Sequence, residues 1–321
     1  MIHAHVLEDF DEPVLALLRA KLTDSVQLTS GSDIPAITNI LIGGRPAREQ
    51  LAACLNLRAL IVPWAGVPEN TRELLHDFPQ VTLHNLHHNA GATAEMALAL
   101  LFAAAKYIVP LDQKLRANDW SPRYAPARSL GLEGKTALII GYGQIGQRVG
   151  RVCHALGMNV IATRRNRIEQ DDVAEVHPIS DLPQLLPRAE AVVITAPLTP
   201  ETKGLIGERE LAALPHDAVL VNVGRGAIVD EGALYHALKN GQLAAAGIDV
   251  WYNYPTDEAS QANTPPSNYP FGDLDNVVLS PHRGGDDKDI DVARMRDLAE
   301  LLNAAARGEK MANQVDLEAG Y

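Results

Sequence analysis

The sequence predicts an α/β protein of two domains, each built on a parallel sheet covered by helices. The chain has 321 residues, which is longer than one ordinary core and fits about two domains. Short β-branched runs alternate with helical stretches in both halves, and this order favours parallel sheets. Between the halves lies a long stretch of different composition, which is rich in Ala, Leu and Lys.

The first half contains three short apolar runs that we expect to form strands. Ile40–Ile42 ends at two glycines, Ala59–Val62 ends at Pro63, and residues 81–83 form the third run. A helix is expected between the first two runs, over residues 47–57. Strand, helix and strand with short connections indicate parallel pairing.

A single long helix is expected next, over residues 93–116. Thr93 is a suitable N-cap, and Pro110 is the only proline or glycine of this stretch. A helix of this length suits a connection between two sheet domains. Residues 119–132 contain prolines and a glycine and are expected to form a loop.

The second half contains six further strand candidates and ends in a helix. The candidates are Thr136–Ile140, residues 159–162, 191–195, 219–223 and 246–250, and Val277–Leu279. Residues 252–274 hold several prolines and are expected to form a long irregular loop, and such loops often carry function. Ile290–Ala306 shows an amphipathic helix pattern.

Composition excludes several classes of partner. The formal net charge is −12, which argues against nucleic-acid binding because phosphate recognition favours basic surfaces. The most apolar stretch, residues 96–105, is far short of the about 20 residues that span a bilayer, so no membrane partner is expected. The N-terminus lacks the pattern of a secretory signal. Cys54 and Cys153 show no metal or CxxC spacing, so we expect buried thiols, no metal and a cytoplasmic location.

The strongest local motif is Gly-Tyr-Gly-Gln-Ile-Gly at residues 141–146, which follows an expected strand and opens an expected helix. Gly141 permits the tight turn, Gly143 lets the backbone approach a pyrophosphate, and Gly146 lets helix and strand pack closely. The helix N-terminus, at Gln144 and Ile145, would present N–H groups to the anion. The motif predicts a dinucleotide-binding Rossmann domain, with a purely structural turn as the alternative.

The end of the next expected strand bears on which dinucleotide is bound. An NAD site usually carries Asp or Glu about 20 residues after the glycine motif. No acid is present here, whereas Arg164, Arg165 and Arg167 are. Guanidinium groups suit a 2′-phosphate, so we expect NADP(H) rather than NAD(H), bound near Thr163, Arg164 and Arg165. Ordinary surface arginines are the alternative.

Two further motifs follow expected strands. Arg225 lies between two glycines directly after residues 219–223. Open α/β sheets bind ligands at the carboxyl ends of their strands, and a guanidinium there can hold a carboxylate with two hydrogen bonds. His282 follows Val277–Leu279 and precedes Arg283 and two glycines, a position that favours an acid/base role over a structural one.

The motifs GYGQIG, PLTPET, VNVGRGAIVDEGAL, GIDVW and SPH occur in the order typical of the D-isomer-specific 2-hydroxyacid dehydrogenase family. The chain resembles this family from about Trp64 to His282, and in particular its NADP-leaning, glyoxylate/hydroxypyruvate reductase-like branch. The resemblance implies two Rossmann-like or flavodoxin-like domains, with the cofactor domain inserted into the substrate domain. Residues 93–284 would bind NAD(P), residues 1–92 and 285–321 would form the discontinuous substrate domain, and the protein would be a homodimer.

The resemblance also implies roles for individual residues. Arg225 matches the substrate-binding arginine and His282 the proton donor. Substrate-side positions are Ala65, Gly66, Val67 and Asn89. Cofactor-side positions besides those named above are Pro197, Val223, Gly224, Asp249 and Gly284, of which Asp249 matches the residue that holds the nicotinamide end. The implied reaction interconverts a small 2-oxo acid and its D-2-hydroxy acid, with reduction as the expected direction.

One position departs from the family pattern. The family has a glutamate just before the proline that follows the GIDVW motif, where it pairs with the histidine, and Tyr254 stands there in this chain. A phenol can hydrogen-bond an imidazole but cannot stabilise imidazolium as a carboxylate does. Tyr254 is therefore a third candidate catalytic residue, and Asp257 or Glu258 is an alternative source of the missing acid. Two other functions stay open: a non-catalytic dinucleotide sensor, and oxidation of an unusual small anion.

Overall fold

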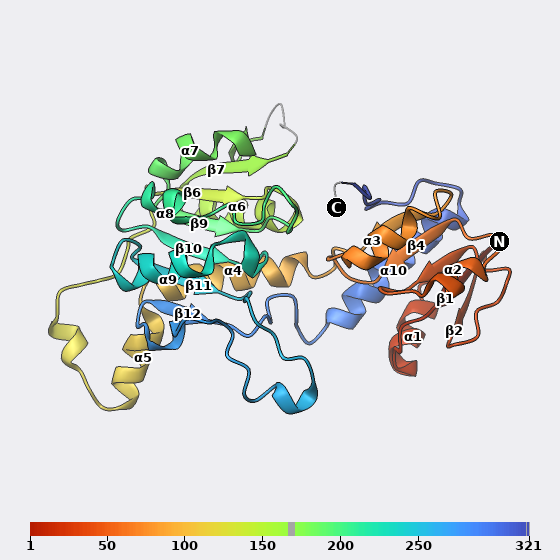
Figure 1. Ribbon diagram of the computed structural model, residues 1–321, viewed down its shortest axis with the longest axis horizontal. Coiled ribbons are helices and arrows are strands. Elements are labelled where there is room, and N and C mark those ends of the chain that lie inside the picture. The colour runs from red at the N-terminus through yellow and green to blue at the C-terminus, as the bar shows by residue number, and fades with distance from the viewer. Residues whose placement is uncertain (166–170, 319, 321) are drawn as a thin grey trace. The chain divides into compact units, whose positions relative to one another are not determined.

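The computed structural model describes residues 1–165, 171–318 and 320, and the chain divides into two compact units (Figure 1). One unit comprises residues 1–89 and 286–321, and the other comprises residues 90–285. The second unit is therefore inserted into the sequence of the first. The assignment of residues 93–284 as the cofactor domain and of the flanking residues as the substrate domain stays a prediction.

The first unit is a five-stranded parallel sheet with helices on both faces. The strand order is β2-β1-β3-β4-β5, an order common among doubly wound sheets. Helices α1 and α10 cover one face, and α2 and α3 cover the other. The elements are β1 (Ile2–Val6), α1 (Glu12–Arg19), β2 (Val26–Ser30), β3 (Ile40–Ile42), α2 (Arg48–Ala52), β4 (Ala59–Val62), α3 (Glu69–Leu75), β5 (Thr82–Asn85) and α10 (Ile290–Ala306).

The second unit is a seven-stranded parallel sheet of order β12-β11-β10-β9-β6-β7-β8. Its six strands from β8 to β11 follow the order of dinucleotide-binding folds. The strands are β6 (Thr136–Ile140), β7 (Asn159–Arg164), β8 (Glu175–Pro178), β9 (Ala191–Ile194), β10 (Val219–Asn222), β11 (Ala245–Ile248) and β12 (Val277–Leu279). The α-helices are α4 (Ala90–Ala105), α5 (Ile108–Arg116), α6 (Gln144–Ala155), α7 (Leu182–Leu185), α8 (Glu208–Ala212) and α9 (Glu231–Lys239). Two parallel sheets confirm the predicted α/β fold class.

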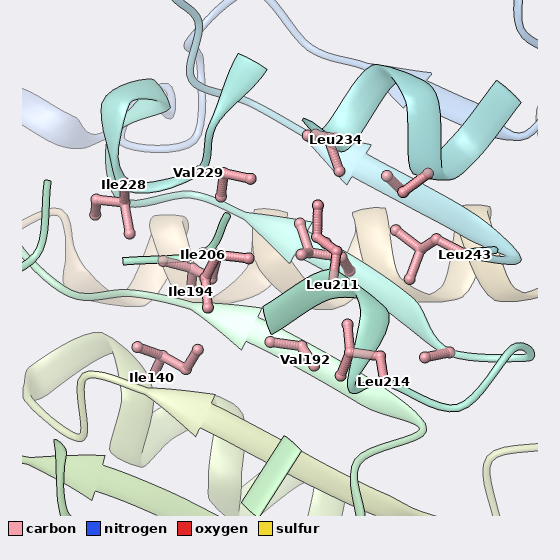
Figure 2. Close-up of a cluster of buried hydrophobic side chains, with 14 of the residues drawn as sticks. Ile140, Val192, Ile194, Ile206, Leu211, Leu214, Ile228, Val229, Leu234 and Leu243 are labelled. Atoms are coloured by element: carbon pink, nitrogen blue, oxygen red, sulfur yellow. The ribbon is translucent and has the colours of Figure 1, made fainter. Parts of the chain in front are cut away.

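Each face of the seven-stranded sheet has its own hydrophobic core. Helices α7, α8 and α9 cover one face, and α4 and α6 cover the other. Figure 2 shows the first core, in which Val192 and Ile194 of β9 meet Leu211 of α8 and Leu234 of α9. These side chains are almost wholly buried, so the sheet and its helices hold the loops at the strand ends on a rigid base.

The single helix expected over residues 93–116 is wrong, because two helices, α4 and α5, occupy this stretch. Pro110 lacks the N–H that a continuous helix would bond to residue 106, and its ring clashes there. Tyr107, with a left-handed φ of +54°, makes the break, and its hydroxyl donates to the Ala244 carbonyl at 2.8 Å. Since α4 begins at Ala90, Thr93 is not its N-cap. Helix α2 is likewise shorter than the expected 47–57.

Among the described residues, no single helix has the length and apolar composition needed to cross a bilayer. Helices α4 and α5 meet those two criteria only when they are taken together, as a pair bent by 65°.

His88, after β5, is half-buried in the first unit, and its neutral form is favoured there. Its Nδ1 atom is buried and has no hydrogen-bond partner among the described residues. Burial, helped by the positive charge of Arg294, lowers the pKa of His88 to about 4, although Asp297 and Asp291 oppose the shift. The site is therefore built for a neutral imidazole.

We expect the substitution His88→Gln to reduce the loss of stability in acid. The unfolded chain protonates this histidine below about pH 6.5, whereas the folded chain keeps it neutral down to about pH 4, so stability falls as the pH falls through that window. Because the group is partly solvated, the effect is about 1–2 kcal/mol. Urea unfolding between about pH 7 and pH 4.5 measures it. The exposed His76→Gln is the control, and identical pH slopes for all three proteins would contradict the assignment.

Candidate active site

Two glycines of the 141–146 motif occupy points where no side chain fits. Gly141 follows β6 with a φ of +99°, and a Cβ there would lie 2.6 Å from the Cα of Ala196. A Cβ on Gly146 would lie 2.3 Å from the Gly141 carbonyl oxygen and 3.0 Å from the Thr195 hydroxyl. The first glycine therefore permits the turn, and the third permits α6 to pack against the sheet.

The N-terminus of α6 is arranged to receive an anion. Gly143 is its N-cap residue, and no side chain of the described residues caps it. A helix leaves its first N–H groups without intrahelical partners, and these point out of its N-terminal end with partial positive charge. A Cβ on Gly143 would meet no atom within 4 Å. Open space before Gln144 and Ile145 thus suits the pyrophosphate of a dinucleotide.

The carboxyl end of β7 holds the residues expected at the adenosine ribose. The Thr163 carbonyl accepts the N–H groups of Gly141 and Tyr142, so this strand end supports the glycine turn directly. The Thr163 hydroxyl is buried without a hydrogen-bond partner in the described part of the chain. Arg164 and Arg165 are exposed beside it. Arg167, the third arginine of this stretch, lies outside the described residues.

Arg225 projects from a tightly packed turn after β10. A Cβ on Gly224 would lie 2.7 Å from the Ala196 carbonyl oxygen, and one on Gly226 would lie 2.3 Å from the Trp251 carbonyl oxygen. The turn is therefore held by backbone contact on both sides of Arg225. Its guanidinium is exposed, donates to the Gly224 carbonyl at 2.7 Å, and forms no ion pair with the described carboxylates. Such a cation is well placed to bind an organic anion.

Asp249 holds the loop that carries His282. Its buried carboxylate accepts the Ser280 hydroxyl at 2.5 Å and the N–H groups of Arg283 and Gly284, each at 2.9 Å. His282 itself has a left-handed φ of +59°, which costs free energy in a residue other than glycine. The three hydrogen bonds to Asp249 offset that cost. The family resemblance implied a cofactor role for Asp249. Its hydrogen bonds to the loop of His282 were not predicted, because no sequence pattern indicates them.

Tyr254 contacts His282, as expected from its place in the sequence. The phenol oxygen lies 2.9 Å from His282 Nδ1 and accepts the Trp251 N–H at 3.0 Å. The phenol can donate to Nδ1 of a neutral ring that carries its proton on Nε2, or accept from a protonated Nδ1. It holds the ring in either case, but as a neutral group it does not add the negative charge that a carboxylate would. Asp257 uses its carboxylate to accept the Ser260 N–H at 2.8 Å, which caps a short 3₁₀ turn.

The expected substrate-side residues lie in the first unit. Ala65, Gly66 and Val67 follow β4, and the Ala65 carbonyl accepts the side-chain amide of Asn85 at 2.7 Å. Asn89 is the last residue of that unit before α4. The remaining candidates, which are Pro197, Val223, Gly224, Asp249 and Gly284, lie in the second unit at or after the carboxyl ends of strands. Arg225, Tyr254 and His282 lie in the same unit, in the loops after β10, β11 and β12.

A family model matches this chain over residues 98–284, with the description D-isomer specific 2-hydroxyacid dehydrogenase, NAD binding domain. The glyoxylate reductase of Aeropyrum pernix is 39% identical over 235 residues, which are 71% of this chain and 67% of that protein. The D-3-phosphoglycerate dehydrogenase of Methanocaldococcus jannaschii is 34% identical, over 70% of this chain and 41% of the relative. The chain therefore spans about two thirds or less of the length of these relatives.

A solved structure shares the fold over nearly the whole length of both chains. It is the D-isomer specific 2-hydroxyacid dehydrogenase of Xanthobacter autotrophicus Py2 in complex with NADPH and MES. The TM-score is 0.81 at 25% identity, and 99% of each chain is covered.

Proposed function

Because this chain belongs to the D-isomer specific 2-hydroxyacid dehydrogenase family, we propose that it reduces a small 2-oxo acid to the D-2-hydroxy acid with NADPH. The family consists of NAD(P)-dependent oxidoreductases that act on a CH–OH group. The exposed guanidinium of Arg225 at a strand end, which forms no ion pair with the described carboxylates, is the observation that carries the proposal, since a substrate carboxylate would pair with it. Relatives named glyoxylate reductase favour the reductive direction.

Each catalytic candidate has one task in this proposal. The bound nicotinamide supplies the hydride. Arg225 binds the carboxylate and stabilises the negative charge that develops on the carbonyl oxygen. The imidazolium form of His282 gives that oxygen a proton from Nε2 and is left as the neutral ring, which Tyr254 orients through Nδ1. The substrate-binding roles that the family resemblance implies for residues 65–67 and Asn89 stay a prediction.

The choice of NADPH over NADH rests on the arginines after β7. Arg164 and Arg165 are exposed at the strand end where the adenosine ribose binds in this fold. A guanidinium pairs well with a 2′-phosphate. The Xanthobacter autotrophicus protein, which holds NADPH, supports the same choice.

Replacing Arg225 tests the reaction class. A screen of NADPH consumption over small 2-oxo acids identifies the best substrate, and Arg225→Ala should then lower kcat/KM by about 10²–10³-fold, because it removes both carboxylate binding and oxyanion stabilisation. Dissociation constants for NADPH should change little. The exposed Arg209→Ala, on α8, is the matched control. Turnover that survives Arg225→Ala, or no turnover of any 2-oxo acid by the native protein, would sink the proposal.

The contact between Tyr254 and His282 predicts an unusual pH profile. A neutral phenol lacks the negative charge that would stabilise imidazolium, so we expect kcat/KM for reduction to fall as the pH rises from about 6 to 8. A carboxylate would stabilise imidazolium, so Tyr254→Glu should move the fall to higher pH. Glu258→Gln should leave the profile unchanged unless Glu258 replaces the missing acid. A native profile that is flat to about pH 8 and is unmoved by Tyr254→Glu would refute the role given to Tyr254.

We also propose that the protein is a homodimer through α5 and the segment that follows it. Apolar side chains are exposed along this stretch of the second unit, and an apolar surface of this kind usually marks an interface. They are Ile108, Leu111, Leu115, Trp120 and Tyr124.

Charges placed on that surface should dissociate the dimer. Leu115→Asp combined with Trp120→Asp would bury two unpaired carboxylates in the interface, which should weaken dimerisation by at least about 100-fold. Sedimentation at micromolar concentration measures the change. Leu55→Asp, an exposed leucine of the first unit, is the control. A native protein that is monomeric, or a dimer indifferent to the double substitution, would refute the interface.

A further inference from the structure

An ion pair connects two loops at the carboxyl edge of the seven-stranded sheet. Arg165 follows β7, Glu201 lies in the loop after β9, and Arg165 Nη2 is 3.9 Å from Glu201 Oε2. Strands β7 and β9 are not neighbours, because both pair with β6 from opposite sides. The pair therefore spans the edge at which Gly141 follows the end of β6, beside the expected dinucleotide site.

Glu201 lies on an ordered loop, and the charged form of its carboxylate is favoured. The loop turns through Thr202, whose hydroxyl donates to the Pro197 carbonyl at 2.7 Å and accepts the Thr199 N–H at 2.8 Å. A hydrogen bond from Thr199, and to a lesser degree the charge of Arg165, lowers the pKa of Glu201. The Glu201 side chain is mostly exposed, so its effect on a bound ligand would come from its charge and not from packing.

We propose that Glu201 is a determinant of cofactor selectivity, supplying from the β9 loop the acid that is absent from the end of β7. An acid at the adenosine ribose accepts the 2′-hydroxyl of NADH and repels the 2′-phosphate of NADPH. Glu201 also competes with that phosphate for Arg165. The two arginines and the glutamate thus act in opposite directions, and the preference for NADPH is smaller than the arginines alone would produce. This inference rests on the proposed binding of a nicotinamide dinucleotide.

Equilibrium binding separates this proposal from a merely structural ion pair. Nicotinamide fluorescence titrations give the dissociation constants of NADPH and NADH for the native protein and Glu201→Gln. The substitution removes one negative charge beside the phosphate, so NADPH should bind roughly three- to tenfold more tightly, whereas NADH should bind equally or more weakly. Raising the salt to about 0.5 M should shrink the gain, because the glutamate is exposed. Glu208→Gln, an exposed glutamate in the first turn of α8, is the matched control.

A second variant tests the competition for Arg165. Arg165→Gln should weaken NADPH binding, and the gain from Glu201→Gln should be smaller in that background, since part of it comes from releasing Arg165. If the native protein binds both dinucleotides and Glu201→Gln changes their affinities equally, or no more than the control does, the selectivity role is overturned while the proposed function stands. If the native protein binds neither dinucleotide, the proposed function itself fails and the inference with it.

Discussion

The loops after β6, β9 and β10 meet at the carboxyl edge of the seven-stranded sheet. They can approach this closely because glycines leave room for direct backbone contact. Ala196, after β9, is the meeting point. A Cβ on Gly141 would lie 2.6 Å from its Cα, and a Cβ on Gly224 would lie 2.7 Å from its carbonyl oxygen. Both distances are too short for a side chain. The glycine turn after β6 and the turn that presents Arg225 are therefore supported by the same residue, and the geometry of one constrains the other.

The loop with His282 is held by a different interaction. A buried carboxylate, Asp249, gathers one hydroxyl and two backbone N–H groups around a histidine with a left-handed backbone. The ring is then oriented by a phenol instead of a second carboxylate. A neutral partner keeps the contact but gives up the charge that would favour imidazolium. The contact therefore holds the histidine ring without a carboxylate beside it.

Much of the fold follows from local patterns. The β-branched runs at Ile40–Ile42, Ala59–Val62 and Thr136–Ile140 are strands with those bounds, and the amphipathic pattern at Ile290–Ala306 is α10. The strands are buried on both faces and are therefore continuous apolar runs, whereas α10 buries apolar residues along one face. Strands β1, β2 and β8 were not anticipated. The break between α4 and α5 was not predicted either, although Pro110 removes an N–H from the helix. The residues on both sides of it are rich in Ala and Leu, and this composition favours a continuous helix.

The sequence by itself determined the family, the parallel α/β sheets and the glycine turns, because a left-handed φ or a backbone contact admits almost no other residue. It also identified Tyr254 as the partner of His282, through its place in a motif. Only the tertiary structure decided how the polar groups face each other. The Trp251 N–H reaches the Tyr254 oxygen through the course of one loop, and Glu201 reaches Arg165 because β7 and β9 flank β6. Local propensity carries no information on strand order, so contacts between loops from different strands arise only when the sheet is assembled.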